Sequence, residues 1–159
     1  LYPDRVNKLV LMSGKSTPTS NDSVLHKLNA LLTRAQIDQA KIGEVTACWL
    51  YTSEFMSKTE FKSILAASLE QSKTFSPIGR KGQIVSNQID LTDKLKSIKA
   101  ETLVIAGDED ILIFPKQTKA LAGNLPNAKF VLLENCAHMP QIEKPEELAV
   151  LLKEYLAWC

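Results

Sequence analysis

Two turns of this sequence carry side chains suited to acid–base chemistry. The first holds three adjacent carboxylates, Asp108, Glu109 and Asp110, and the second holds His138. An imidazole can take a proton from a nucleophile and pass it to a leaving group, while a carboxylate holds the ring and stabilises its charged form. A carboxylate paired with His138 would therefore supply two of the three members of a catalytic triad.

Each turn follows a short apolar run of the kind that forms a buried strand. The runs are residues 102–106 and 128–133, and Pro115 opens a predicted helix between them. A strand, a helix and a second strand in this order predict two parallel neighbours in one sheet, whose carboxyl ends lie at the same edge. We therefore expect Asp110 and His138 to meet at that edge.

The sequence resembles the C-terminal half of the α/β-hydrolase family, most of all its small esterases, lactonases and carbon–carbon bond hydrolases. The residues that carry the resemblance are 102–110 with Pro115, 136–140, 143–147 and, near the start of the chain, 2–11. The resemblance implies an α/β fold in which a three-stranded parallel sheet has flanking helices and an all-helical lid insertion. It also implies that residues 1–19 and 88–159 belong to the core and that residues 20–87 form the lid.

The family pattern places the triad acid three residues after the glycine that ends its strand. Counted from Gly107, that position is Asp110. The resemblance therefore assigns Asp110 as the acid and His138 as the base, with Asp108 and Glu109 as competitors for the acid. The alternatives are that Asp110 caps a helix or lies on the surface, and that His138 sits in an ordinary turn.

The family nucleophile is a serine in a G-x-S-x-G turn that precedes the acid and the histidine along the chain. The sequence has six glycines, and no pair of them brackets a serine at that spacing. The resemblance therefore puts the nucleophile before Leu1, on a segment that these residues do not include.

The resemblance also suggests where a substrate would bind, because in the family the apolar inner face of the lid selects it. The candidates are the aromatic and sulfur-containing residues Trp49, Tyr51, Phe55, Phe75 and Met139. Packing inside the lid is the alternative for each aromatic residue. Within this region, helical spacing predicts one helix over residues 22–42, and a capping box at Ser57 and Glu60 predicts the start of another.

Charge and composition argue against several classes of partner. The 159 residues carry 19 basic and 18 acidic side chains, mixed along the chain, for a net charge of +1. We therefore expect no binding to nucleic acid or to an anionic membrane. No apolar run is long enough to span a bilayer.

The cysteines point to an intracellular protein. Cys48, Cys136 and Cys159 are odd in number and far apart, which suits neither a disulfide framework nor a zinc site. We therefore expect a cytoplasmic protein with no cofactor. A metal held by Cys136 and His138 is the alternative.

Three functions remain open. The first is a hydrolase of small esters, thioesters or lactones that uses Asp110 and His138. The second is a non-catalytic fragment or binding subunit that lacks the nucleophile. The third is a dehalogenase or a carbon–carbon bond hydrolase with the same fold.

The run from Val6 to Met12 predicts a strand buried on both faces. In the resembled fold this strand is central, and its neighbour on the far side is absent from these residues. Because an unpaired strand edge attracts another strand, we expect self-association, or pairing with a missing N-terminal half, through this strand.

Overall fold

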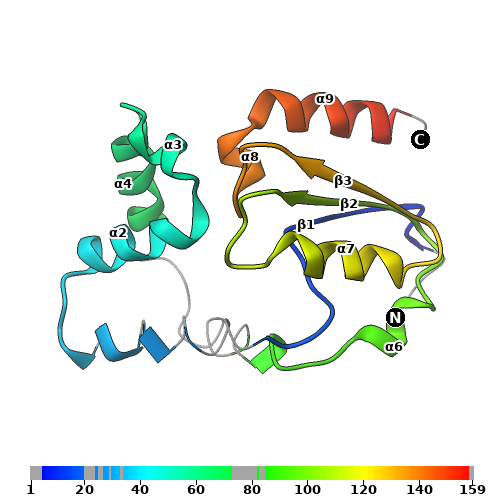
Figure 1. Cartoon of the computed structure of the whole chain (residues 1–159), viewed down its shortest axis with the longest axis horizontal. Helices are drawn as coiled ribbons and strands as arrows, with labels where there is room; N and C mark the ends of the chain where they lie inside the picture. The colour runs from blue at the N-terminus through cyan, green and yellow to red at the C-terminus, as the bar shows by residue number, and fades with distance from the viewer. Residues whose placement is uncertain are drawn as a thin grey trace.

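The structure is a computed structural model that describes residues 5–19, 24, 27–28, 30–32, 34–72, 82 and 85–157. Its elements in chain order are β1 (Lys8–Met12), α2 (Gln39–Leu50), α3 (Ser53–Ser57), α4 (Phe61–Ser72), α6 (Thr92–Leu95), β2 (Glu101–Gly107), α7 (Pro115–Gly123), β3 (Ala128–Leu133), α8 (Pro140–Glu143) and α9 (Pro145–Leu156). The three strands form a parallel sheet in the order β1-β2-β3 (Figure 1). The predicted three-stranded parallel sheet with flanking helices is therefore confirmed.

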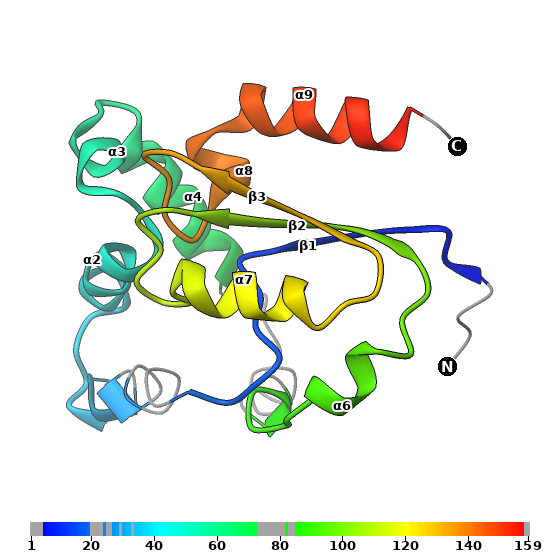
Figure 2. The same ribbon diagram turned by 45° about the vertical axis from the view of Figure 1, so that its right-hand side comes forward.

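The central strand β2 is buried because a helix covers each face of the sheet, α7 on one side and α9 on the other (Figures 1 and 2). Val104 packs with Leu121 of α7. Its neighbours Leu103 and Ile105 point to the opposite face and pack with Leu148 of α9. Successive side chains of a strand alternate between faces, so this apolar run fills both layers of the core.

β1 is less buried than its sequence predicts. Lys8 to Leu11 are half-buried, Met12 is 40% exposed, and Val6 just before the strand is 45% exposed. The prediction of a strand buried on both faces is therefore wrong for this chain. The physical reason is that β1 forms one edge of the sheet, with no neighbour on its far side among the described residues.

The helices α2, α3 and α4 lie beyond the carboxyl ends of β2 and β3, where the strand arrows point (Figures 1 and 2). Their common core is built on Ala47, Tyr51 and Phe55. The Tyr51 ring lies 5.5 Å from the rings of both Phe55 and Phe61, which themselves lie 6.0 Å apart. Offset and edge-to-face pairs at these distances add to the stability that burial provides.

The helix predicted over residues 22–42 does not run through to its expected end. Gln36 has a φ of 55°, which no residue inside an α-helix adopts. A new helix, α2, then begins at Gln39, where the Asp38 side chain accepts a hydrogen bond of 2.9 Å from the Ala40 amide. The expected start near Asp22 lies outside the described residues.

The capping box predicted at Ser57 and Glu60 is also wrong. Ser57 ends α3, and its hydroxyl donates to the Glu54 carbonyl at 2.7 Å. The hydroxyl of Thr52 caps α3 instead, accepting from the Phe55 amide at 3.1 Å. Thr52 has Phe55, rather than a glutamate or glutamine, three positions later, so the capping-box pattern pointed to Ser57 and missed Thr52.

The last helix begins as predicted, with Pro145 in its first turn, and lies on the sheet. The predicted apolar stripe is confirmed for Leu148, Leu151, Leu152 and Tyr155, which pack on the sheet. It is wrong for Leu156, which is exposed.

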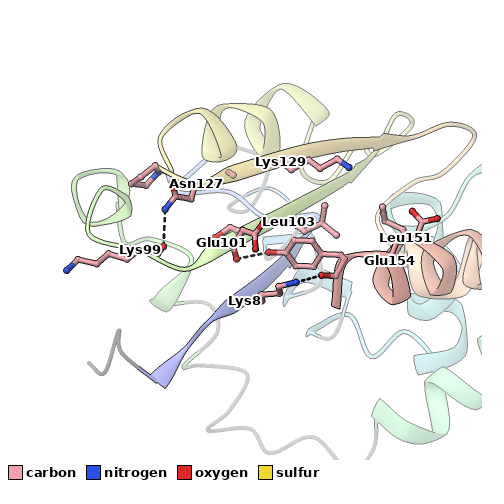
Figure 3. Close-up of a pocket in the computed structure, with 12 residues that line it drawn as sticks. Lys8, Lys99, Glu101, Leu103, Asn127, Lys129, Leu151 and Glu154 are labelled. Atoms are coloured by element: carbon pink, nitrogen blue, oxygen red, sulfur yellow. Dashed lines mark hydrogen bonds between the residues drawn. The ribbon is translucent and has the colours of Figure 1, made fainter. Parts of the chain in front are cut away.

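The Tyr155 end of α9 is anchored at the amino ends of the strands. The Tyr155 hydroxyl donates to the Glu101 carbonyl at 2.6 Å, and Lys8 Nζ donates to the Tyr155 carbonyl at 2.6 Å (Figure 3). These residues line a hollow of about 810 Å³. It lies at the opposite end of the sheet from the acidic and histidine turns, so the hollow is separate from the candidate chemistry.

Candidate active site

Asp110 and His138 meet at the carboxyl edge of the sheet. Nδ1 of His138 lies 2.9 Å from Oδ2 of Asp110. The Asp110 side chain is fully buried, whereas the His138 side chain is 21% exposed. The predicted convergence of these two side chains is therefore present, with the imidazole accessible and the carboxylate beneath it.

Two backbone amides fix the orientation of the buried carboxylate. Oδ1 of Asp110 accepts hydrogen bonds from the amides of Leu112 and Ile113, each 2.9 Å long. A buried carboxylate is stable only when its oxygens are hydrogen-bonded, and here both are. Asp110 is therefore not a surface carboxylate, and it does not cap α7, whose N-cap position is Phe114.

The other two acidic residues of this turn bond to the backbone of Cys136 rather than to the ring of His138. Asp108 Oδ1 accepts a hydrogen bond of 3.2 Å from the Cys136 amide, and the Glu109 amide donates to the Cys136 carbonyl at 2.9 Å. The Glu109 side chain is exposed. These two bonds join the acidic turn to the histidine turn, while the bond to the ring comes from Asp110.

Gly107 allows the two turns to come this close. A Cβ atom on Gly107 would lie 2.2 Å from the Cys136 carbonyl oxygen and 2.3 Å from the Ala137 carbonyl oxygen. Real Cβ atoms do not approach backbone oxygens to that distance, so a larger residue would force the turns apart. The glycine is required by close approach rather than by its dihedral angles.

One further residue at this edge, Glu143, was not predicted from the sequence. Glu143 is almost fully buried, and its two carboxylate oxygens accept from the amides of Ala137 and Thr52 at 2.8 and 2.9 Å. Glu143 belongs to the stretch that carries the family resemblance, but neither partner is at a spacing that predicts contact. The sequence feature that could have drawn attention to Glu143 is its position two residues before Pro145, which opens α9.

Comparison with known proteins decides the family. A sequence model of the alpha/beta hydrolase fold matches residues 1–145. The chain belongs to this family. A 2-hydroxymuconate semialdehyde hydrolase of Pseudomonas putida is 29% identical to this α/β hydrolase chain over 168 aligned residues, covering 98% of the chain and 56% of that protein.

Two further proteins are similar to part or all of the chain. A proline iminopeptidase of Lactobacillus helveticus is 40% identical over 65 residues, which are 41% of this α/β hydrolase chain and 22% of that protein. A thermophilic esterase of Thermogutta terrifontis has a TM-score of 0.78 at 22% identity, covering 98% of the chain and 57% of that structure. The structural likeness at this identity shows the fold alone. The chain spans little more than half the length of the relatives that match it from end to end.

The candidate substrate-binding residues of this α/β hydrolase chain have different surroundings. Tyr51 and Phe55 are buried in the core shared by α2, α3 and α4, and Met139, next to His138, packs against that core. Trp49 is half-buried, and Phe75 lies outside the described residues. A substrate-binding role for these residues stays a prediction, although the buried position of Tyr51 and Phe55 gives them a packing role as well.

The part of the chain that the structure describes contains neither a membrane-spanning helix nor a metal-binding group of side chains. No helix there combines the length and apolar character needed to cross a bilayer. No group of three histidine, cysteine or acidic side chains there is placed to hold a metal ion.

The Cys136 thiol should be inert. Burial raises its pKa to about 12, and the nearby negative charge of Glu143 adds to the rise. Because the pKa is raised, the unreactive protonated thiol persists through pH 8. Cys48 is exposed, so a thiol reagent at pH 8 should label Cys48 and spare Cys136, as read by peptide mass spectrometry. Labelling of Cys136 as fast as Cys48 without denaturant would contradict the buried position.

Proposed function

We propose that this chain supplies the acid and the base of an α/β-hydrolase active site that cleaves small carboxylic esters, thioesters or lactones. The observation that carries the proposal is the bond of 2.9 Å between His138 Nδ1 and the fully buried Asp110 carboxylate. A carboxylate at Nδ1 favours the tautomer with its proton on Nδ1. The other ring nitrogen, Nε2, is then the proton acceptor.

The chemistry follows the order of a nucleophile–histidine–acid triad. His138 takes the hydroxyl proton of a serine as the serine oxygen attacks the carbonyl carbon of the substrate. The charged imidazolium is stabilised by Asp110, and it then gives the proton to the departing alcohol or thiol. A water molecule then attacks the acyl-enzyme, with His138 again taking and returning the proton. This step releases the acid and restores the serine.

The nucleophile of this proposal lies on a segment outside the 159 residues. None of the six glycines forms the G-x-S-x-G turn, and the chain spans 56% of its Pseudomonas putida relative. Cys136 is an unsuitable substitute because its pKa is about 12. We propose a serine, whereas an aspartate at that position would favour the dehalogenase alternative.

We propose that the acyl group of the substrate binds beside His138 and the lid. Met139 follows His138 directly, and with half-buried Trp49 it is our first candidate for the wall of the acyl site. Tyr51 and Phe55 are proposed to form the floor behind them. A second substrate class, the hydroxymuconate semialdehydes, is favoured by the name of the relative that covers 98% of this chain.

The direct test is covalent labelling of the natural protein with a fluorophosphonate, followed by peptide mass spectrometry. The proposal expects one labelled serine, outside these 159 residues, and loss of labelling in the His138→Ala variant. A panel of chromogenic short-chain esters, a thioester, a lactone, 2-hydroxymuconate semialdehyde and a proline anilide then ranks the substrates. No labelling together with no turnover sensitive to His138→Ala would instead support the non-catalytic binding module.

We also propose that β1 pairs with a strand outside this chain or with a second copy. The support is that β1 is an edge strand whose end residue Met12 is 40% exposed. The 159-residue chain by itself should therefore be a dimer or larger in light scattering. Addition of a separately expressed N-terminal half should compete with that self-association. A monodisperse monomer whose β1 amides exchange freely with solvent would contradict the proposal.

A further inference from the structure

Glu143 joins the lid to the histidine turn through its side chain. The Glu143 residue is buried, with 7% of its surface exposed. Oε1 accepts from the Ala137 amide at 2.8 Å, and Oε2 accepts from the Thr52 amide at 2.9 Å. Ala137 directly precedes His138, and Thr52 lies in the lid between α2 and α3.

A second hydrogen bond runs between the same two segments without passing through Glu143. The His138 amide donates to the Leu50 carbonyl at 3.1 Å. Around these bonds, Met139 and Ile142 pack against the buried lid residues. The short lid segment that connects α2 to α3 is therefore packed and hydrogen-bonded to the turn that carries the histidine.

The stability of the buried Glu143 carboxylate depends on both of its hydrogen bonds. A buried carboxylate that accepts two amide hydrogen bonds is stable, but it becomes costly when one oxygen loses its partner. Displacement of the lid segment would remove the Thr52 amide from Oε2 and leave that oxygen buried and unpaired. The position of the lid and the position of the histidine turn are thus linked in part through the Glu143 side chain.

We propose that Glu143 is a positioning residue that couples the lid to His138, so that a correctly seated lid is needed for an aligned histidine. This inference rests on the proposed function for its catalytic consequence, but the coupling itself is a property of the fold. The Glu143 carboxylate accepts from backbone amides rather than from the ring of His138. It acts through the backbone of Ala137.

The backbone of Thr52 offers a sharp test. Its φ is −67° and that of the preceding Tyr51 is −128° with ψ 152°, which are the angles that proline and a residue before proline adopt. Thr52→Pro therefore removes the amide that binds Oε2 without changing Glu143. Thr52→Ala is its matched control, because it also loses the capping hydroxyl but retains the amide.

The readout is amide hydrogen exchange in the natural protein. Thr52→Pro should reduce protection of the Ala137 amide by about 10-fold or more relative to Thr52→Ala, while the β2 amides of Val104 and Ile105 remain as protected as in the control. Glu143→Gln keeps the shape but has one accepting oxygen, so it should weaken protection at Thr52 and Ala137. The exposed Glu147→Gln variant should leave both amides unchanged.

A double-mutant cycle separates coupling from general loss of stability. If Glu143 is the link, Thr52→Pro should have no further effect on the Ala137 amide when Glu143 is already alanine. An additive effect, an unchanged Ala137 amide in Thr52→Pro, or equal loss of protection throughout β2 would overturn the inference. If the alanine variant does not fold, Glu143→Gln takes its place in the cycle.

Turnover provides the catalytic readout. Thr52→Pro should lower kcat by about 10-fold more than Thr52→Ala, with the larger change in kcat rather than in KM, because the histidine is misaligned. Exchange coupling without this drop in kcat would overturn the catalytic part of the inference. Absence of turnover in the unmodified protein would instead refute the proposed function and leave the exchange result to decide the coupling.

Discussion

Asp110→Asn should lower kcat for ester hydrolysis by about four orders of magnitude, the scale set by removing the acid of a histidine triad. The asparagine side chain keeps the size of the aspartate, and its carbonyl oxygen can still accept from the Leu112 and Ile113 amides. Its NH₂ group then faces Nδ1 of His138. Because an NH₂ group can only donate, Nδ1 must accept, and the ring proton moves to Nε2. The ring can then no longer take a proton from the nucleophile.

Glu109→Gln is the control for this variant. Glu109 belongs to the same turn, and its side chain is exposed, while its bond to Cys136 is made by its backbone amide. Neutralising an exposed carboxylate should change kcat by only about 2-fold. Equal effects of the two variants, or an Asp110→Asn enzyme within 10-fold of the unmodified one, would show that Asp110 is not the acid.

Gly107→Ala should strongly lower the stability of the folded chain, because it adds a methyl group where the two turns meet. Its Cβ would lie 2.2 and 2.3 Å from two carbonyl oxygens of the histidine turn. Overpacking against fixed backbone costs about 3 kcal/mol, which lowers the melting temperature of a domain of this size by roughly 6–12 °C. The turns must also separate, so hydrolysis should fall with stability. Thermal unfolding followed by circular dichroism measures the first effect.

Gly123→Ala is the matched control. A Cβ on Gly123 would meet no atom within 4 Å. Gly123 ends α7, where alanine has the higher helix propensity, so its melting temperature should be unchanged or slightly raised. If the Gly107→Ala and Gly123→Ala variants have the same melting temperature, the close approach of the two turns is not the reason that position 107 requires glycine.

The sheet could be predicted because its signals are local. The apolar runs of β2 and β3 and the proline that opens α7 each lie within a few residues of the element that they define. All three strands could be placed in this way, and the parallel pairing of β2 with β3 then brought Asp110 and His138 to one edge. The choice of Asp110 over its two acidic neighbours came from the family pattern, because composition and periodicity are the same for all three.

The contacts between the histidine turn and the segment from α2 to α3 could not be predicted, because they join residues far apart in the chain. Glu143 and Thr52 are separated by 91 positions, and no periodicity relates them. The predicted helix boundaries in the region of α2, α3 and α4 were wrong for a different reason. Thr52 and Ser57 are both hydroxyl residues able to cap a helix, and the choice between them depends on which segment is buried. The exposure of β1 likewise depends on what lies beside it, which a strand's own sequence does not specify.

The bond between Asp110 and His138 can be measured directly by ¹⁵N-histidine NMR, since the chain has two histidines and the spectrum is correspondingly simple. We predict that the neutral His138 ring carries its proton on Nδ1, with a strongly downfield proton resonance, and that Asp110→Asn moves the proton to Nε2. A neutral His138 ring protonated on Nε2 in the unmodified protein, and unaffected by Asp110→Asn, would contradict it.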